Sequence, residues 1–471
     1  MDLHLVLDRR GDLAAGVYRA LRDAVEDGRL GVGDRLPSTR ELARDLGIAR
    51  NTVAAAYDAL VAEGYAEGRT GSGTYALGVA PAGVLRPSGA GPFARVPLST
   101  PVPEAPIEFD LRLGLPDPGA FPAAAWRRVL ADAVDEAVRT APGYGDPAGD
   151  PGLRASIARH VSVSRGVRVA PGEVIVTGGA QGAFDLMART HVRPGDRVAV
   201  EDPGYPPARE AFAAAGAAIV GVPVDGDGLV TDALPPDARA VVVTPAHQMP
   251  MGVTMSGARR ASLLAWADRT GAFIVEDDYD SEFRHAARPL EPLQRLDRTG
   301  RVVYVGSFSK TLVPMLRIGF LVAPEPLVAR LADARRLAGW HAETTTQFAL
   351  RRLIDDGTFG RHLRRSRRVY RGRHDRLVAA VSSDLATWLR LNPAAAGLHI
   401  AALAVPGIDA ARIRVVVALA RARGVAVESL DAYATGEDVR PGIAMGFGAI
   451  PEERIPEAVR RLRDAFAEAA S

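Results

Sequence analysis

Lys310 has the most distinctive chemistry in this sequence. It is the single lysine in a chain whose lysines and arginines together number 58. A general preference for arginine that left one lysine by chance is the plain alternative. A lysine amine, however, can lose its proton and form a Schiff base with a carbonyl group, whereas a guanidinium stays charged and is a poor nucleophile. The sequence therefore predicts a carbonyl cofactor bound to Lys310.

Groups suited to a phosphate lie close to this lysine. Ser307 and Ser309 precede it in the segment GSFSK, and Arg317 follows it by seven residues. Hydroxyl and guanidinium groups of this kind hold a phosphate dianion through charge-assisted hydrogen bonds. We therefore expect Ser307, Ser309 and Arg317 to bind a cofactor phosphate near the lysine.

Carboxylates and a tyrosine follow the apolar segment 273–275 in the order Glu-Asp-Asp-Tyr. A buried carboxylate at the carboxyl edge of a sheet can keep a pyridine nitrogen protonated. We assign this role to Asp277, and a hydrogen bond to the oxygen on the ring to Tyr279. An acidic loop in solvent is the alternative interpretation.

Two more segments fit the same cofactor. Ala180 and Gln181 open a predicted helix after the apolar segment 174–176, where free backbone amides bind phosphate. Tyr205 follows the next apolar segment and could stack on a cofactor ring, although a lone tyrosine more often packs in the core.

Short apolar segments must place these residues. They alternate with helical stretches from about residue 108 onward, which predicts a mostly parallel sheet covered by helices on both faces. The section 330–471 starts helical and then mixes strands and helices, which indicates a smaller α/β subdomain. The predicted strands are 174–176, 197–200, 241–243, 273–275 and 302–305.

The N-terminal region has a different pattern. Helical spacing predicts helices over about 12–27, 38–47 and 49–63, and the Gly-rich segment that follows predicts a hairpin. Ser38 with Glu41 forms a capping box at the start of the second helix. The order is typical of a winged helix-turn-helix, an α+β fold that binds DNA.

Several polar residues lie where such a fold meets DNA. The first turn of the third helix reaches base edges, so Arg50 and Asn51 are the leading base readers. A solvated helix face is the alternative for each arginine taken alone. The full set of predicted DNA-binding residues is Arg40, Arg50, Asn51, Thr52, Arg69 and Gly71.

Composition limits the remaining possibilities. The 471 residues are too many for one ordinary core, and the absence of cysteine excludes disulfides, thiolate metal sites and cysteine nucleophiles. The formal charge of +2 is too small for a general polyanion binder, so DNA contact must come from a local patch. We expect a cytoplasmic protein without a membrane span, and we predict no metal site.

Two known families resemble the two parts of the chain. The segments GDRLPSTRELA (33–43), LGIARNTV (46–53) and GSGT (71–74) resemble the GntR-type winged helix. The segments YGDPAG (144–149), TPAHQMP (244–250) and EDDYDSEFR (276–284), with Lys310, resemble fold-type I aminotransferases that depend on pyridoxal phosphate. Their order resembles the MocR branch of GntR regulators.

This resemblance implies a domain plan, a cofactor and partners. It predicts a DNA-binding domain over 1–78, a linker over 79–107 and an aminotransferase-like effector domain over 108–471. It also implies pyridoxal 5'-phosphate as a Schiff base on Lys310, a double-stranded DNA operator, an amine or amino acid effector, and a domain-swapped homodimer.

The sequence departs from the aminotransferase pattern at two places. Met249 stands where an asparagine normally bonds the oxygen on the cofactor ring, so His247 or Gln248 is expected to take that role. No arginine is obvious on the last strand for an effector carboxylate, which leaves Arg440 as the candidate and Arg209 as a weaker one.

Three functions are compatible with these features. The first is a transcription regulator that senses an amine through aldimine chemistry at Lys310, with at most residual transaminase activity. The second is a working aminotransferase that its N-terminal domain localises. The third is a regulator that senses pyridoxal phosphate itself.

Overall fold

The computed structural model describes residues 12–69, 71–77, 106–140, 143–285, 291–392, 394, 396–436 and 440–470. Contacts divide the chain into two units, Met1–Val102 and Pro103–Ser471, and each is described by itself. The predicted linker, 79–107, falls almost entirely outside the described residues, so its bounds stay a prediction.

The first unit contains three helices and a two-stranded antiparallel hairpin. Ser38 accepts a hydrogen bond from the amide of Glu41 at 3.2 Å, and Glu41 accepts one from the amide of Ser38 at 2.9 Å, which confirms the capping box. The second helix ends at Gly47, whose φ of +65° suits a residue without Cβ. The elements are α1 (Leu13–Glu26), α2 (Thr39–Leu46), α3 (Arg50–Ala62), β1 (Ala66–Arg69) and β2 (Gly73–Ala76).

The second unit is built on an eight-stranded sheet in the order β4-β11-β10-β9-β8-β5-β6-β7. The five predicted strands are all present, and those that pair with each other do so in parallel. Strand β11 was not predicted, and it runs antiparallel between β4 and β10. The strands are β4 (Val174–Thr177), β5 (Arg197–Asp202), β6 (Ala218–Asp225), β7 (Gly228–Leu229), β8 (Ala240–Val243), β9 (Phe273–Asp278), β10 (Val302–Ser307) and β11 (Gly319–Val322).

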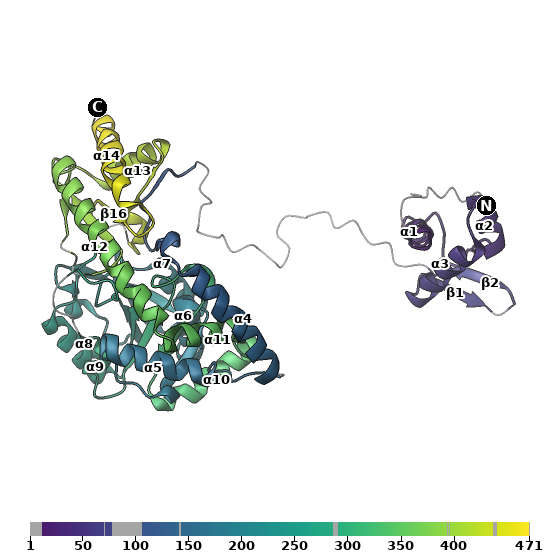
Figure 1. Cartoon of the computed structure of the whole chain (residues 1–471), viewed down its shortest axis with the longest axis horizontal. Helices are drawn as coiled ribbons and strands as arrows, with labels where there is room; N and C mark the ends of the chain where they lie inside the picture. The colour runs from purple at the N-terminus through teal and green to yellow at the C-terminus, as the bar shows by residue number, and fades with distance from the viewer. Residues whose placement is uncertain are drawn as a thin grey trace. The chain divides into compact units, whose positions relative to one another are not determined.

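Helices cover both faces of this sheet (Figure 1). Alternate residues of a strand point to opposite faces, so Val303 and Val305 pack with α6, α7 and α10, whereas Tyr304 packs into the larger core cluster with α5 and α11. The large-sheet helices are α4 (Ala123–Thr140), α5 (Pro151–Arg165), α6 (Gly179–His191), α7 (Pro206–Ala214), α8 (Gly257–Thr270), α9 (Leu293–Leu296), α10 (Glu325–Gly339) and α11 (Thr344–Asp355).

A smaller part at the end of the chain has its own antiparallel sheet in the order β12-β13-β16-β15. The long helix α12 (Thr358–Asp384) leads into it and packs against α14 (Figure 1). Its other elements are β12 (Leu389–Leu391), β13 (His399–Ala404), α13 (Ala410–Ala422), β15 (Glu428–Ser429), β16 (Gly442–Gly446) and α14 (Ile455–Ala469).

Short elements complete the second unit. Strand β3 (Phe109–Asp110) pairs in parallel with β14 (Val425–Ala426), which ties the start of this unit to its last part. Among the described helices, none is long and apolar enough to cross a membrane. The 3-10 turns are Pro118–Ala120, Pro171–Glu173, Thr231–Ala233, Pro314–Leu316, Leu430–Tyr433 and Glu452–Arg454.

Candidate functional site

A cavity, open at its mouth, lies at the carboxyl ends of β4, β9 and β10. Parallel strands bring their carboxyl ends to one edge of a sheet, where α/β proteins bind ligands. Eight of the nine predicted cofactor residues line it together with Lys310, and the exception is His247. The lining is Gly114, Ala180, Gln181, Tyr205, Met249, Asp277, Tyr279, Ser307, Ser309, Lys310, Pro314 and Arg317.

Lys310 points its amine into this cavity. Its Nζ donates a hydrogen bond to the carbonyl oxygen of Gly114 at 2.6 Å. A Cβ on Gly114 would lie 2.7 Å from that nitrogen, and the φ of Gly114 is +75°, so any other residue would be strained there and would displace the lysine amine. Burial lowers the pKa of Lys310. A lowered pKa favours the neutral amine, the form that reacts with a carbonyl group.

Asp277 supplies an unpaired acid at the end of β9. It is 4% exposed, and among the described residues its Oδ1 has no hydrogen-bond partner. Burial raises the pKa of Asp277 well above its usual range, and the neighbouring Asp278 adds to this. A buried carboxylate without a partner is costly, so a cationic N–H from a ligand ring would satisfy it. The pyridine ring of pyridoxal phosphate fits this requirement.

The opposite end of the cavity is suited to a phosphate. Helix α6 begins there after Gly178, which makes no side-chain cap, so the first amides of the helix, including those of Ala180 and Gln181, face the ligand space. Arg317 donates from Nη2 to the carbonyl oxygen of Gly178 at 2.8 Å. Ser307 and Ser309 hydrogen bond to each other at 3.0 Å beside it. The structure thus brings the predicted phosphate-binding residues to one cavity, and their role stays a prediction.

Two tyrosines border the cavity between these ends. Burial, with the charge of Asp277, raises the pKa of Tyr205 to about 12, so its phenol stays protonated. Burial also raises the pKa of Tyr279 well above its usual range. The hydroxyl of Tyr279 donates to the carbonyl oxygen of His247 at 3.0 Å, which fixes its position.

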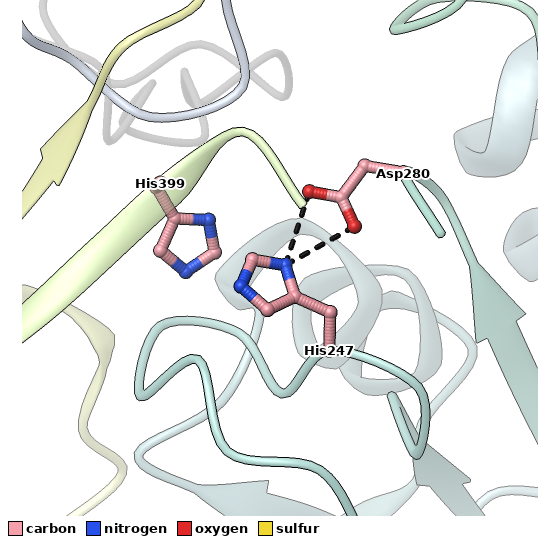
Figure 2. A group of neighbouring side chains, drawn as sticks. All are labelled: His247, Asp280 and His399. Atoms are coloured by element: carbon pink, nitrogen blue, oxygen red, sulfur yellow. Dashed lines mark hydrogen bonds and ion pairs between the residues drawn. The ribbon is translucent and has the colours of Figure 1, made fainter. Parts of the chain in front are cut away.

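His247 lies behind Tyr279 instead of in the cavity lining. Figure 2 shows its ring between Asp280 and His399. Its Nδ1 is 3.1 Å from both carboxylate oxygens of Asp280, and the centroids of the two imidazole rings are 4.2 Å apart. His399 bonds through Nε2 to the carbonyl oxygen of Pro250 at 3.0 Å. His247 therefore contacts Tyr279 and is absent from the cavity lining, and its predicted contact with the cofactor stays a prediction.

Gln248 is also unsuited to replace the missing asparagine. Its Nε2 donates to Glu201, Pro203 and Met249 at 2.8–3.1 Å, and its Oε1 accepts from the amide of Met251 at 2.9 Å. All its polar atoms are therefore engaged in the core. Met249 itself lines the cavity and presents a thioether there.

Some residues differ from the sequence expectations. Arg440 is exposed and is absent from the cavity lining, and Arg209 donates to the carbonyl oxygen of Ala434 at 2.7 Å. Gly114 and Pro314 line the cavity and were not predicted. No pattern around either residue marks it, because each reaches the site through the tertiary fold.

In the first unit, four of the predicted DNA-binding residues lie at the starts of two helices. Arg40, Arg50 and Asn51 are exposed in the first turns of α2 and α3, and Thr52 is half-buried. Arg50 Nε donates to Thr39 Oγ1 at 3.3 Å, which links the two helix starts. This arrangement leaves the first turn of α3 free to meet a DNA groove.

The antiparallel hairpin of β1 and β2 follows these helices, in the place of the predicted wing. Arg69 pairs with Glu67 at 2.6 Å and lies over the ring of Tyr75 at 4.5 Å, so its side chain is held at the hairpin tip. Gly71 has a φ of +78°, and a Cβ on Gly73 would lie 2.9 Å from Arg35 Nε. Glycine at 73 therefore lets Arg35, which the sequence did not single out, approach the wing.

Family comparisons match both units. Residues 13–76 match the family described as "Bacterial regulatory proteins, gntR family". Residues 114–461 match "Aminotransferase class I and II".

Individual relatives agree with these matches. The chain is 37% identical to "Probable rhizopine catabolism regulatory protein MocR" of Rhizobium meliloti, over 98% of this chain and 96% of that protein. It is 36% identical to "HTH-type pyridoxine biosynthesis transcriptional regulator PdxR" of Corynebacterium glutamicum, over 94% of each. A solved kynurenine aminotransferase of Pyrococcus horikoshii is 28% identical, with a TM-score of 0.72, over 78% of this chain and 92% of that chain.

Proposed function

We propose that this chain, which belongs to the MocR-type regulators of the GntR superfamily, regulates transcription in response to a small amine or amino acid that reacts at Lys310. It joins a DNA-binding domain to a fold that binds pyridoxal phosphate. The observation that carries this proposal is the pairing, in one cavity, of a buried lysine amine with the unpartnered carboxylate of Asp277.

Pyridoxal phosphate, when bound, supplies an aldehyde that condenses with primary amines and a ring that accepts electron density. The chain's own groups hold it. Arg317, Ser307, Ser309 and the amides at the start of α6 would bind the phosphate, and Asp277 would accept a hydrogen bond from the protonated ring nitrogen. Their positions around the cavity support this assignment.

Two side chains then control the reacting end. Lys310 holds or releases a proton at Nζ, and its lowered pKa keeps a neutral fraction available to an incoming amine. Tyr279 stays protonated, its hydroxyl donates to the carbonyl oxygen of His247, and the His247–Asp280 pair helps to fix its orientation. Together these residues would position an incoming amine and move a proton at Nζ beside a bound cofactor.

The first unit reads the operator in this proposal. Arg50 and Asn51 contact base edges, whereas Arg40, Thr52, Arg69 and Gly71 contact the phosphate backbone. The exposure of the first turn of α3 supports this division. A domain-swapped homodimer would pair two such units on two half-sites, and an effector changes DNA affinity only if it prefers one arrangement of the dimer.

A working aminotransferase is the second candidate, since Lys310, Asp277 and the phosphate site form a complete set. The exposed Arg440 and the thioether of Met249 argue against efficient turnover, because no arginine besides Arg317 lines the cavity in the described part of the chain.

The test is an absorption titration of the purified protein with pyridoxal phosphate and a panel of amines and amino acids. We expect a visible band that shifts with one chemical class of amine, and no release of a 2-oxo acid over many turnovers. Sustained 2-oxo acid production would favour the aminotransferase. A band with no response to any amine would favour sensing of the cofactor alone.

A further inference from the structure

Helix α12 has a concentration of positive charge that neither the cofactor site nor the DNA-binding unit explains. Its 27 residues include eight arginines and two acids. One face of the helix is buried and includes Phe359, Leu363 and Tyr370. The opposite face exposes Arg361, Arg364, Arg365, Arg368 and Arg371, and we call these five residues the α12 stripe.

The spacing of the stripe makes it continuous. Its first four members stand at positions i, i+3, i+4 and i+7, which share one face of a helix. From Arg361 to Arg371 the helix rises about 15 Å, which equals the rise of roughly four base pairs of duplex DNA. Arg361, Arg364, Arg365, Arg367 and Arg368 also line one open, shallow region of the surface.

Nearby acids do not neutralise the stripe. Asp355 pairs with Arg159 at 2.6 Å and Asp356 with Arg128 at 3.9 Å. Glu282 is engaged by His160 and by Arg367, which lies beside the stripe. Within the described part of the chain, the guanidinium groups of Arg364, Arg365 and Arg368 have no ion pair or hydrogen bond.

We propose that the α12 stripe is a second DNA-binding surface, which contacts the phosphate backbone of duplex DNA held by the winged helix. Arginine suits phosphate because its planar fork donates two parallel hydrogen bonds. The stripe is too long for one phosphate group, so a polyanion fits it better than a small anion. The chain already binds DNA through its first unit, which raises the effective DNA concentration at the second.

This inference rests on the DNA-binding part of the proposed function and assigns the effector domain a direct role in it. Phosphate contacts carry no sequence information and weaken with salt. The stripe therefore adds affinity and leaves base recognition to α3.

The experiment compares three full-length proteins loaded with cofactor, using long mixed-sequence duplex DNA as the probe. The first is the wild type. The second carries Arg364→Gln, Arg365→Gln and Arg368→Gln. The third is a matched control with Arg193→Gln, Arg269→Gln and Arg298→Gln, three exposed arginines that precede β5, β9 and β10. Both variants change the formal net charge from +2 to −1, since each loses three positive charges.

The measurement is DNA affinity over a range of salt concentrations. Each lost phosphate contact lowers the magnitude of the slope of log affinity against log salt by about 0.9. The slope of the stripe variant should therefore be smaller by up to about 2.7, and this variant should bind DNA at least tenfold more weakly at low salt. The control should match the wild type. Equal slopes for the stripe variant and the wild type, or equal losses in both variants, would overturn the proposal.

A fourth protein, Arg50→Ala, separates this inference from the proposed function. Arg50→Ala could weaken binding to a selected operator while the stripe variant keeps the wild-type slope of log affinity against log salt. That result would support the proposed regulatory function and refute the second DNA-binding surface. Failure of the wild type to bind any duplex would refute both.

Discussion

Replacing Asp277 with asparagine should weaken cofactor binding without weakening the fold. The carboxylate is 4% exposed, its Oδ1 has no partner among the described residues, and burial raises its pKa well above the usual range. In the protein without cofactor, an unpaired buried charge lowers stability. Asp277→Asn removes that charge and keeps the shape of the side chain.

The size of the effect follows from the bond that is lost. A hydrogen bond to a charged group contributes about 1.5–3 kcal/mol, and about 1.4 kcal/mol corresponds to a tenfold change in affinity. Asp277→Asn should therefore bind pyridoxal phosphate roughly 10- to 150-fold more weakly. The thermal midpoint of the cofactor-free variant should equal or exceed that of the wild type.

The assay is equilibrium titration with pyridoxal phosphate followed by absorption, together with thermal unfolding of the cofactor-free proteins. Asp278→Asn is the matched control, because Asp278 is a buried neighbour that pairs with Arg165 at 2.7 Å. Breaking that pair should cost about 3–5 kcal/mol of stability. Unchanged cofactor affinity in Asp277→Asn, or a loss of stability like that of Asp278→Asn, would refute the assigned role.

The other predictions concern the amine, the operator and pH. Lys310→Ala should remain folded and show no amine-dependent visible band, and a band that survived in this variant would place the reacting amine elsewhere. Arg50→Ala should cost about 1–3 kcal/mol of operator affinity by gel shift, whereas Arg19→Ala, at an exposed position on α1, should cost nothing measurable. Burial raises the pKa of Glu201 from 4.5 to about 7, so its contribution to stability is fully present below about pH 4.5 and is lost as pH rises through 7. Glu201→Gln should make the thermal midpoint depend less on pH over that window. Midpoints that fall with pH equally in the wild type and the variant would contradict this.

The sequence predicts much of this fold because its signals are local. The capping box at Ser38, the left-handed Gly47 and the buried apolar strands each depend on neighbours a few residues away. Strand β11 (Gly319–Val322) was missed, because a four-residue apolar segment is a weak local signal and its strand pairing with β4 and β10 is set by the tertiary fold.

Most of the residues that line the cavity were predictable for the same reason, and two residues were not placed correctly from the sequence. Lys310, Asp277 and Arg317 are marked by residue type and by the strands before them. Gly114 is not marked, because it meets Lys310 across 196 positions of sequence. His247 was assigned to the cofactor from its position next to Met249, yet hydrogen bonds to Asp280 and Tyr279 hold it behind the cavity.

The central claim is that chemistry at Lys310 controls DNA binding. The direct measurement follows cofactor absorption and operator anisotropy in one sample during titration with the amine that shifts the visible band. If the claim is correct, both signals change over the same amine concentrations in the wild type. The DNA affinity of Lys310→Ala should not change when the amine is added. An amine that shifts the absorption band while operator affinity stays constant would contradict the claim.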